Sequence, residues 1–385
     1  MPVSLAMKGD RLLFSGLKCA CGAAHHAPTQ DLYIGLDMAR KLPRYLKKRE
    51  LGQKAVLVSD QAGYDAAGKR TLDALRKEGF EVTLALLTHP LADERALGEV
   101  MLTMRMDTEF FIGVGAAAVA AVTRAAAAQT ERPSALVATQ PDGCDYLSQE
   151  ARMLFRGEPM TLPAVAPEVV AFDLNALAEA PPEAYAQGLL DLAACHLARA
   201  DWASMGLIRG DAYCPLCADM AVEAAERAFA AADLIAARGE EGARRMAESL
   251  LMAGVAAFVS GGARPVTSAA QRMARRAAQG GARYDEALFA AVPELLDAYR
   301  NYDPEGAAEA GGDAGARAAL TARRSALRQV LERLPQGSAV AGTASRVAPE
   351  LTAAEVTSAL PRAADIAACE GLMDFAALAG RPLLP

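Results

Sequence analysis

Hydrophobic residues in the first half of the chain fall into short runs, separated by longer stretches whose apolar positions recur at helical spacing. The alternation of Val82, Leu84 and Leu86 predicts a strand, and the other short runs also end at polar or glycine residues, as strands do. The predicted strands are 55–58, 81–87, 110–115, 135–139 and 169–172. Helical patterns at 92–104 and 116–128 lie between strands. This alternation predicts a parallel sheet with right-handed crossovers, in the α/β class.

The second half of the chain carries helical stripes instead of strand signals. A proline-rich connector, residues 157–182, separates the two halves, and we place a domain boundary near Leu162. The predicted helices are 188–202, 217–237, 316–334 and 353–360, and residues 303–315 are predicted to form a flexible excursion. A chain of 385 residues exceeds what one hydrophobic core usually serves. We therefore predict an α/β nucleotide-binding domain over 1–162 and an all-helical domain over 163–385.

The overall composition narrows the class of protein without identifying it. Hydrophobic residues make up 52% of the chain, charged residues make up 23%, and the net charge is −7. This balance gives no basic footprint for nucleic acid. The least charged stretch, residues 249–263, is too short to span a bilayer, and we see no secretory signal. Seven cysteines in a long chain without a visible secretory signal indicate reduced thiols and a cytoplasmic protein.

Asp191 stands out because it follows Leu189 and Leu190 in the apolar segment GLLDLAACHLARADW, residues 188–202. A carboxylate buried among leucines needs a cation, a metal or several N–H donors. The alternative is an ordinary aspartate in the first turn of a helix, where the helix dipole favours negative charge.

Two loops follow predicted strands at the edge where ligands of parallel sheets bind. In the first, Asp60 could accept from ribose hydroxyls or could cap the next helix. In the second, Gly113 and Gly115 could let backbone N–H groups approach a pyrophosphate at a helix N-terminus.

Cysteines and histidines also occur near the N-terminus, as Cys19, Cys21 and His25-His26, and again at Cys214 and Cys217. Together they could form a zinc site, but a CxC partner is unusual spacing for structural zinc. The sequence therefore favours a different interpretation, which rests on a family resemblance.

Several motifs resemble the glycerol-1-phosphate dehydrogenases of the iron-containing alcohol dehydrogenase and dehydroquinate synthase superfamily. Residues 188–202 resemble a family segment GDLLAKYTALADW, and Gly113-Val-Gly115 with Thr123 and Arg124 resembles GVGSGTINDLTR. Further matches are the family's VxDxNTYxxAG, at Asp60, Tyr64, Ala67 and Gly68, its PSMDGYAS, at Pro141, Tyr146 and Ser148, and its GSSRP, at Gly261, Arg264 and Pro265. The family's CxCG…H and YCP segments match Cys19 to His25 and Tyr213 to Pro215, which would make Cys217 incidental.

The resemblance implies a Rossmann-like domain followed by a helical bundle, as in dehydroquinate synthase. It also implies NAD(P)-dependent reduction of dihydroxyacetone phosphate, or related polyol chemistry, in a homo-oligomer. The cofactor would contact Asp60, Gly113, Gly115, Thr139 and Tyr146. A zinc, nickel or iron ion would be held by Asp191, and Arg264 would contact the substrate.

The chain departs from the family at the positions that carry the chemistry. Cys195 replaces a family lysine, Gln271 replaces a metal-binding histidine, and the second histidine, expected around Tyr284, is missing. Ala117 and Ala121 replace polar or glycine positions of the nucleotide turn. We therefore predict that the metal is absent and NAD(P) binding is weakened. The alternative function is a catalytically degenerate member that binds an anionic small molecule or a protein partner. A dehydroquinate-synthase-like enzyme is a third possibility, weakened by the same missing ligands.

Arginines cluster just after Arg264, at Arg272, Arg275 and Arg276. Their spacing places all three near one face of a helix. Either they cover a solvated surface, or they line the cleft, where Arg264 and Arg275 would bind a phosphorylated or carboxylated ligand.

Overall fold

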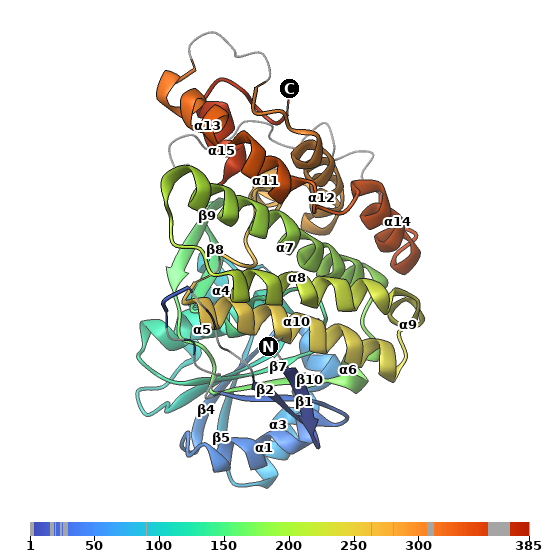
Figure 1. The fold of residues 1–385 in the computed structure, drawn as a ribbon. Coiled ribbons are helices and arrows are strands. Elements are labelled where there is room, and N and C mark those ends of the chain that lie inside the picture. The colour runs from blue at the N-terminus through green and yellow to red at the C-terminus, as the bar shows by residue number, and fades with distance from the viewer. Residues whose placement is uncertain are drawn as a thin grey trace.

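The computed structural model describes residues 4–384 apart from 16–18, 20, 24, 26–29, 90, 263, 280, 306–311 and 353–369. A twisted sheet forms the lower half of the molecule in Figure 1, and a stack of helices lies above it. The strands of the sheet are β1 (Ser4–Lys8), β2 (Arg11–Ser15), β3 (Asp31–Gly35), β4 (Lys54–Ser59), β5 (Glu81–Leu86), β6 (Phe110–Gly115), β7 (Ser134–Ala138) and β10 (Val169–Asp173). Their order is β1-β2-β3-β10-β7-β6-β4-β5.

The core of the sheet is parallel, as the alternating pattern predicts. From β3 through β10, β7, β6 and β4 to β5 every neighbouring pair is parallel, while β1 and β2 add an antiparallel hairpin at one edge. The chain passes from β4 outward to β5 and then returns to β6 on the other side of β4. The carboxyl ends of β4 and β6 therefore form the topological switch point where such sheets bind ligands.

Helices cover both faces of the sheet. On one face α1 (Met38–Lys48) and α3 (Lys69–Lys77) enclose a core that includes Leu57, Ile112 and Val137. On the other face α4 (Glu94–Thr103) and α5 (Ala117–Gln129) pack on Val56 and Phe111. Between β4 and α3 run the short α2 (Gln61–Gly63) and a π-helical turn, Tyr64–Gly68.

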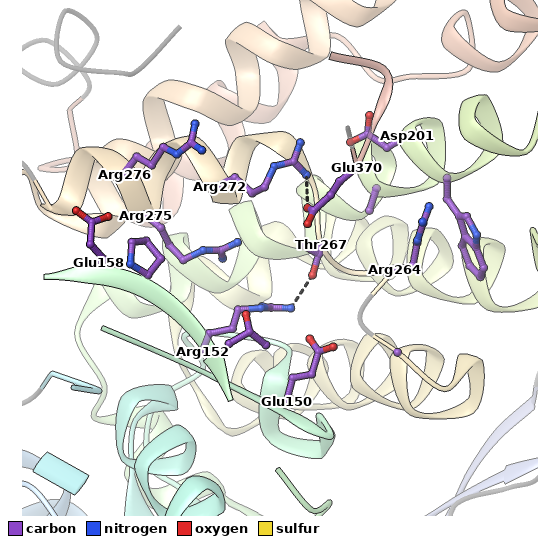
Figure 2. A pocket seen from close by; sticks show the side chains of 15 residues that line it. Glu150, Arg152, Glu158, Asp201, Arg264, Thr267, Arg272, Arg275, Arg276 and Glu370 are labelled. Carbon is purple, nitrogen blue, oxygen red and sulfur yellow. Dashed lines mark hydrogen bonds and ion pairs between the residues drawn. The ribbon is translucent and has the colours of Figure 1, made fainter. Parts of the chain in front are cut away.

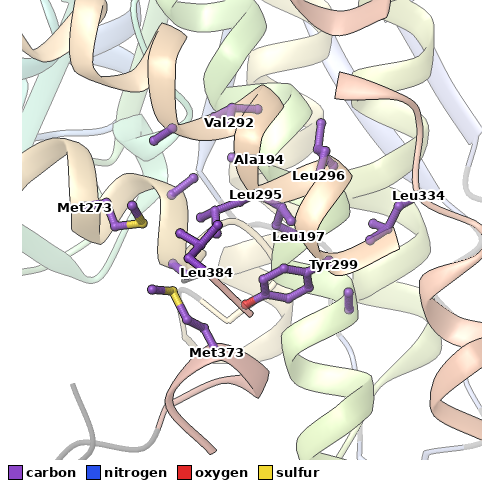
Figure 3. Packing of buried hydrophobic residues seen from close by; sticks show 14 of the residues in the cluster. Ala194, Leu197, Met273, Val292, Leu295, Leu296, Tyr299, Leu334, Met373 and Leu384 are labelled. Carbon is purple, nitrogen blue, oxygen red and sulfur yellow. The ribbon is translucent and has the colours of Figure 1, made fainter. Parts of the chain in front are cut away.

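The helical part is built around α7 (Pro182–Arg209), which contains Asp191. It packs with the remaining helices, whose bounds are α8 (Pro215–Ala230), α9 (Ala232–Ala237), α10 (Glu240–Ser260), α11 (Ala269–Gln279), α12 (Tyr284–Asn301), α13 (Ala314–Leu331), α14 (Gly337–Val347) and α15 (Leu372–Leu378). Figure 3 shows their shared core, in which Leu197, Val292, Leu295 and Tyr299 converge.

The two parts share a continuous hydrophobic core. Ile34, Leu136 and Phe172 of the sheet cluster with Leu250 and Val255 of α10 and with residues of α8. The short α6 (Leu174–Ala178) links β10 to α7. The boundary near Leu162 stays a prediction, although β10 beyond it belongs to the sheet.

Some elements were not predicted. The strands β1 to β3 and β8 (Glu150–Phe155) lie in segments for which no element was predicted, and β9 (Glu158–Pro163), which pairs with β8 in a hairpin, lies in the predicted connector. Pro159 and Pro163 lie in β9, which pairs only with β8, so their missing N–H groups interrupt no second ladder. The predicted helix 353–360 and part of the predicted excursion 303–315 lie outside the described residues.

Candidate functional site

The two glycine-containing loops meet at the switch point. Ser59 Oγ donates to Val114 O at 2.6 Å, which ties the end of β4 to the end of β6. A Cβ on Gly63 would lie 2.6 Å from Val114 O, so only glycine allows this approach. Gly113 and Gly115 similarly let α5 approach β6, since added Cβ atoms would lie 2.5 Å from Thr123 Oγ1 and 2.6 Å from Val119 Cγ2.

Asp60 lies beside this junction and caps a helix. Its Oδ1 accepts from Gly63 N at 2.8 Å, and the side chain is buried. This contact matches the capping alternative. Thr139 is also buried, and its backbone N–H donates to Gly115 O at 3.1 Å.

The N-terminus of α5, where a pyrophosphate would sit in this fold, is occupied by the protein's own Asp142. Ala117 N donates to both carboxylate oxygens of Asp142 at 3.1 Å. The hydroxyl of Tyr146 donates to Asp142 Oδ1 at 3.1 Å, and Gln187 Nε2 donates to the Asp142 carbonyl at 2.7 Å. Burial raises the pKa of Asp142 to about 6, although the hydrogen bonds from Ala117 and Tyr146 stabilise its anion and lower the pKa. The nucleotide turn thus already holds an internal carboxylate.

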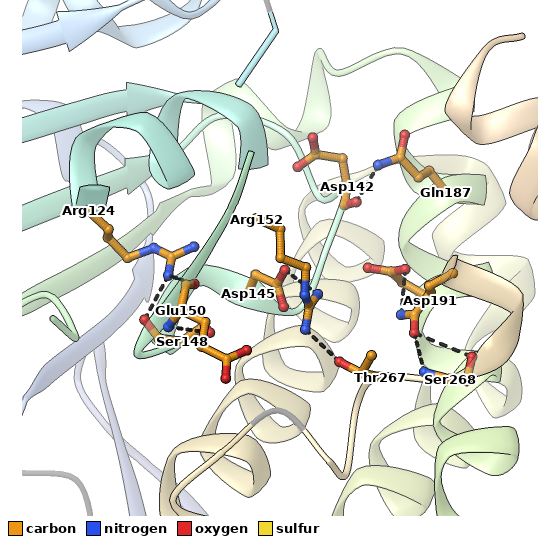
Figure 4. A network of polar contacts seen from close by, with 11 residues as sticks. Arg124, Asp142, Asp145, Ser148, Glu150, Arg152, Gln187, Asp191, Thr267 and Ser268 are labelled. Atoms are coloured by element: carbon orange, nitrogen blue, oxygen red, sulfur yellow. Dashed lines mark hydrogen bonds and ion pairs between the residues drawn. The ribbon is translucent and has the colours of Figure 1, made fainter. Parts of the chain in front are cut away.

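Buried arginines organise the segment after Asp142. Arg124 of α5 donates to the carbonyls of Ser148 at 2.7 Å and Glu150 at 2.6 Å. Arg152 of β8 pairs with Asp145 at 2.7 Å and donates to Thr267 Oγ1 at 2.6 Å, as Figure 4 shows. These contacts join the loop after β7 to the helical part.

Asp191 is part of a polar cluster with Gln271. Gln271 Nε2 donates to Asp191 Oδ1 at 3.0 Å, and Gln271 Oε1 accepts from Ser268 N at 2.8 Å. Burial, and next the like charge of Asp145, raise the pKa of Asp191 to about 6. Arg152 and Arg275 oppose that rise electrostatically. Cys195 lies one turn along α7, with its Sγ 3.7 Å from Asp191 O.

A polar cavity of about 650 Å³ opens next to this cluster, between β8, β9 and the helices. Figure 2 shows Arg272, Arg275 and Arg276 on one side of the cavity and Arg152 across from them. Arg264 lines it too, with an exposed side chain 3.4 Å from Asp211. Arg272 pairs with Asp374 at 2.7 Å. The arginines singled out from the sequence therefore surround one cavity.

Comparisons with known proteins find similarity to dehydrogenases. Residues 33–181 match the model of the iron-containing alcohol dehydrogenases. A glycerol-1-phosphate dehydrogenase [NAD(P)+] from Halalkalibacterium halodurans is 29% identical over 258 residues, which cover 66% of this chain and 64% of that protein. One from Methanoculleus marisnigri is 29% identical over 238 residues, covering 61% of this chain and 65% of the relative. The chain is therefore similar to the glycerol-1-phosphate dehydrogenases. Its match spans less than two thirds of these relatives' length.

Solved structures of an alcohol dehydrogenase and of a sulfoacetaldehyde reductase share the fold. An alcohol dehydrogenase from Oenococcus oeni superposes with a TM-score of 0.65 at 16% identity, covering 86% of this chain and 88% of that one. A sulfoacetaldehyde reductase from Bifidobacterium kashiwanohense, in complex with NAD+, gives 0.59 at 17% identity, covering 82% and 87%. The predicted Rossmann-like domain with a C-terminal helical part is confirmed.

The residues at the position that the resemblance assigns to a metal do not fit a catalytic metal. The resemblance implies Asp191 with two imidazoles, and the chain offers Gln271 and, near Asp191, Tyr284. The amide group of Gln271 that faces Asp191 is its N–H donor, while its only potential metal ligand, Oε1, faces Ser268. Burial raises the pKa of Tyr284, which keeps the phenol neutral. Guanidinium groups of Arg152 and Arg275 supply positive charge instead.

Sequence reasoning missed two groups of residues here. One is Asp142, and the other is Asp145 with Arg152; none of them is among the predicted site residues. No local signal identifies them, because their partners lie far away in the chain, such as Thr267 for Arg152. No helix in the part of the chain that the structure describes is long and apolar enough to cross a membrane.

Proposed function

We propose that this protein is a glycerol-1-phosphate dehydrogenase-like protein whose cleft binds a phosphorylated or carboxylated small molecule. The observation that carries the proposal is the set of arginines around the cavity beside Asp191. Burial, and next the like charge of Arg152, lower the pKa of Arg275, so its cation lacks full compensation in the protein. An anion between Arg152 and Arg275 would supply that compensation through charge-assisted hydrogen bonds.

Similarity to the glycerol-1-phosphate dehydrogenases supports a chemical class for the ligand and for the reaction. Relatives named as NAD(P)+-dependent glycerol-1-phosphate dehydrogenases support an oxidoreductase acting on dihydroxyacetone phosphate or a related polyol. Such a ligand carries a phosphate suited to the arginines. The proposal extends to a homo-oligomer in the cytoplasm, which rests on the resemblance and on cysteine usage.

A second candidate function is ligand binding without redox turnover. Two contacts favour it: Asp142 occupies the N-terminus of α5, and Gln271 donates to Asp191 where a metal ligand would be needed. In this form of the proposal NAD(P) binds weakly, and zinc, nickel or iron is absent at Asp191. The protein would then sense or carry an anionic metabolite, or bind a protein partner.

A thermal-shift screen tests the binding proposal. Dihydroxyacetone phosphate, glycerol phosphate, inorganic phosphate and dicarboxylates are added to the wild type and to Arg275→Gln. We expect stabilisation by at least one of these anions, and its loss in the variant. Arg323→Gln is the matched control, because it removes the same charge from an exposed position on α13. Equal responses in all three proteins, or none in any, would contradict the proposal.

A turnover assay separates the two candidates. NADH and NADPH oxidation is followed with dihydroxyacetone phosphate in metal-supplemented buffer. Turnover that depends on Asp191 supports the dehydrogenase. Anion binding without turnover supports the second candidate.

A further inference from the structure

A cluster of sulfur and nitrogen atoms lies away from the Asp191 cluster and is not used by either candidate function. Cys19, Cys21 and His25 follow β2, and Cys214 precedes α8, 189 residues beyond His25. One ligand atom from each of the four residues lies within 4.8 Å of the other three. The Sγ atoms of Cys19 and Cys214 are 3.6 Å apart, and His25 Nε2 lies 3.1 Å from Cys21 Sγ and 3.2 Å from Cys214 Sγ.

The ring of His25 is oriented by a backbone carbonyl. Its Nδ1 lies 3.1 Å from Val259 O, near the end of α10. A carbonyl oxygen can only accept, so Nδ1 carries the hydrogen and donates it. In the neutral ring the lone pair is then on Nε2, which faces the sulfurs. Histidines that ligate metals characteristically donate their other ring N–H in this manner.

We propose that Cys19, Cys21, His25 and Cys214 bind one zinc ion in a tetrahedral Cys₃His site. Zinc–sulfur bonds of about 2.3 Å and zinc–nitrogen bonds of about 2.0 Å give a tetrahedron with edges of roughly 3.5–3.8 Å. The observed spacings of 3.1 to 3.6 Å are close to those edges, so the donor atoms need to move apart only slightly. Thiolate and imidazole donors of this kind select zinc over magnesium or calcium.

The four ligands indicate that the zinc ion has a structural role. Four protein ligands leave no open position for water or substrate, unlike a catalytic zinc. The site joins the segment after β2 to the start of α8 and, through His25, to the end of α10. Trp202 and Tyr213 pack around it, and Trp202 also lines the arginine cavity. Zinc would therefore fix the N-terminal segment against the helices that form one wall of that cavity.

Two alternatives to the Cys₃His site, a role for Cys217 as a ligand and a disulfide between Cys19 and Cys214, can be distinguished from it. Cys217 is buried in the same cluster, but its sulfur is outside the four-atom group. A disulfide between Cys19 and Cys214 would require their sulfurs to approach from 3.6 Å to about 2.05 Å, which would leave Cys21 and His25 without a common partner.

Metal content of the purified full-length chain tests the proposal. After dialysis against a mild chelator, elemental analysis should find one zinc per chain. Cys214→Ala and His25→Ala should lose it, while Asp191→Ala and Cys217→Ala should retain it. Retention in Asp191→Ala separates this site from the cleft. Zinc-free wild type, zinc retained without Cys214, or zinc lost with Asp191 would each overturn the assignment.

A second measurement needs no variant and therefore does not depend on how well variants fold. X-ray absorption at the zinc edge of the wild type should fit three sulfurs and one nitrogen. Replacement by Co²⁺ should give the intense visible bands of tetrahedral thiolate coordination. A first shell of oxygen and nitrogen alone, or a disulfide between Cys19 and Cys214 found by peptide mapping, would contradict the Cys₃His site.

Discussion

The Asp191 cluster and the cysteine–histidine cluster both bring together residues from distant parts of the chain, yet they differ in what they can bind. At Asp191 the neighbouring groups are an amide N–H donor, the carboxylate of Asp145 and two guanidinium cations, and the two cations can complement an anion. At Cys19, Cys21, His25 and Cys214 the converging atoms are thiols and an imidazole nitrogen, which are ligands of a soft cation. One site has lost the donors that a metal needs, and the other has a complete set.

Family resemblance and donor geometry therefore answer separate questions: the first indicates where a site lies, and the second indicates what it can bind. The family resemblance pointed to Asp191, Gln271 and Tyr284, and in the structure Gln271 donates to Asp191, but location alone does not imply a metal. The cysteine–histidine spacing argued against zinc, although the fold brings its members within 4.8 Å. Lone pairs directed at one point are stronger evidence for a metal than a match to a motif.

The largest effect should come from breaking the cysteine–histidine cluster. Cys214→Ala removes a zinc ligand and should destabilise the fold by about 4 kcal/mol, as losses of structural metals do. We expect the Tm to fall by roughly 5 °C or more. Asp191→Asn should change the Tm far less, because Asn Oδ1 still accepts from Gln271. Differential scanning calorimetry of both variants makes the comparison.

Cys217→Ala is the control for that experiment, since it removes a buried thiol from the same cluster but not a proposed ligand. A similar Tm loss in Cys217→Ala and Cys214→Ala would mean that packing, not a metal, explains the effect.

A smaller effect should appear in the pH dependence of stability. Burial raises the pKa of Asp142 in the folded protein to about 6 from its usual 3.8. The folded state therefore binds this proton more tightly than the unfolded chain does, and the carboxyl group contributes most to stability below about pH 4. That contribution amounts to about 3 kcal/mol and is lost as the pH rises through about 6. Denaturant unfolding between pH 4 and pH 7 measures it.

The matched variant is Asp142→Asn, which cannot ionise. Relative to the wild type it should gain stability as the pH rises from about 4 to 6 and then remain constant. Burial lowers the pKa of His196 to about 4, which produces the opposite trend, but His196 is present in both proteins and its effect cancels in the difference. Parallel pH profiles for the two proteins would contradict the raised pKa of Asp142.

Much of the fold could be predicted from the sequence because its signals are local. The strands at 55–58, 110–115 and 169–172 are short apolar runs, and each lies within one observed strand, β4, β6 or β10. Strand β2 of the edge hairpin and the β8–β9 hairpin escaped prediction because they are only partly buried and contain polar or proline residues. These strands are stabilised by pairing with a neighbouring strand, and no periodic pattern in their sequences predicts them.

The candidate site was less predictable because it depends on contacts between distant segments. Arg272, Arg275 and Arg276 share a helix, so their common face could be predicted from spacing, but not the cavity they face. The pairing of Asp142 with Ala117 requires the loop after β7 to fold back over α5, which no pattern in the loop specifies.

The smallest effect concerns NAD(P) affinity and tests whether Asp142 is what separates this chain from a nucleotide-binding relative. Ala117 N currently donates to the Asp142 carboxylate, whose charge would also repel a pyrophosphate. Asp142→Ala frees this N–H and removes the charge. We expect NADH to bind about tenfold more tightly, the equivalent of one recovered hydrogen bond worth about 1.4 kcal/mol. Isothermal titration calorimetry with NADH and NADPH measures the change, and the wild type should bind more weakly than the roughly micromolar range of ordinary cofactor sites.

Asp93→Ala provides the control for this titration. Asp93 also accepts from N–H groups at a helix N-terminus, those of Arg95 and Ala96, but it caps α4 rather than α5. Its removal should leave NADH affinity unchanged. If Asp142→Ala also leaves the affinity unchanged, the internal carboxylate does not compete with the nucleotide. The alanines at Ala117 and Ala121 would then account for the weak binding. If the wild type already binds NADH at micromolar concentrations, the pyrophosphate displaces the Asp142 carboxylate. That result would favour the dehydrogenase over the candidate without redox turnover.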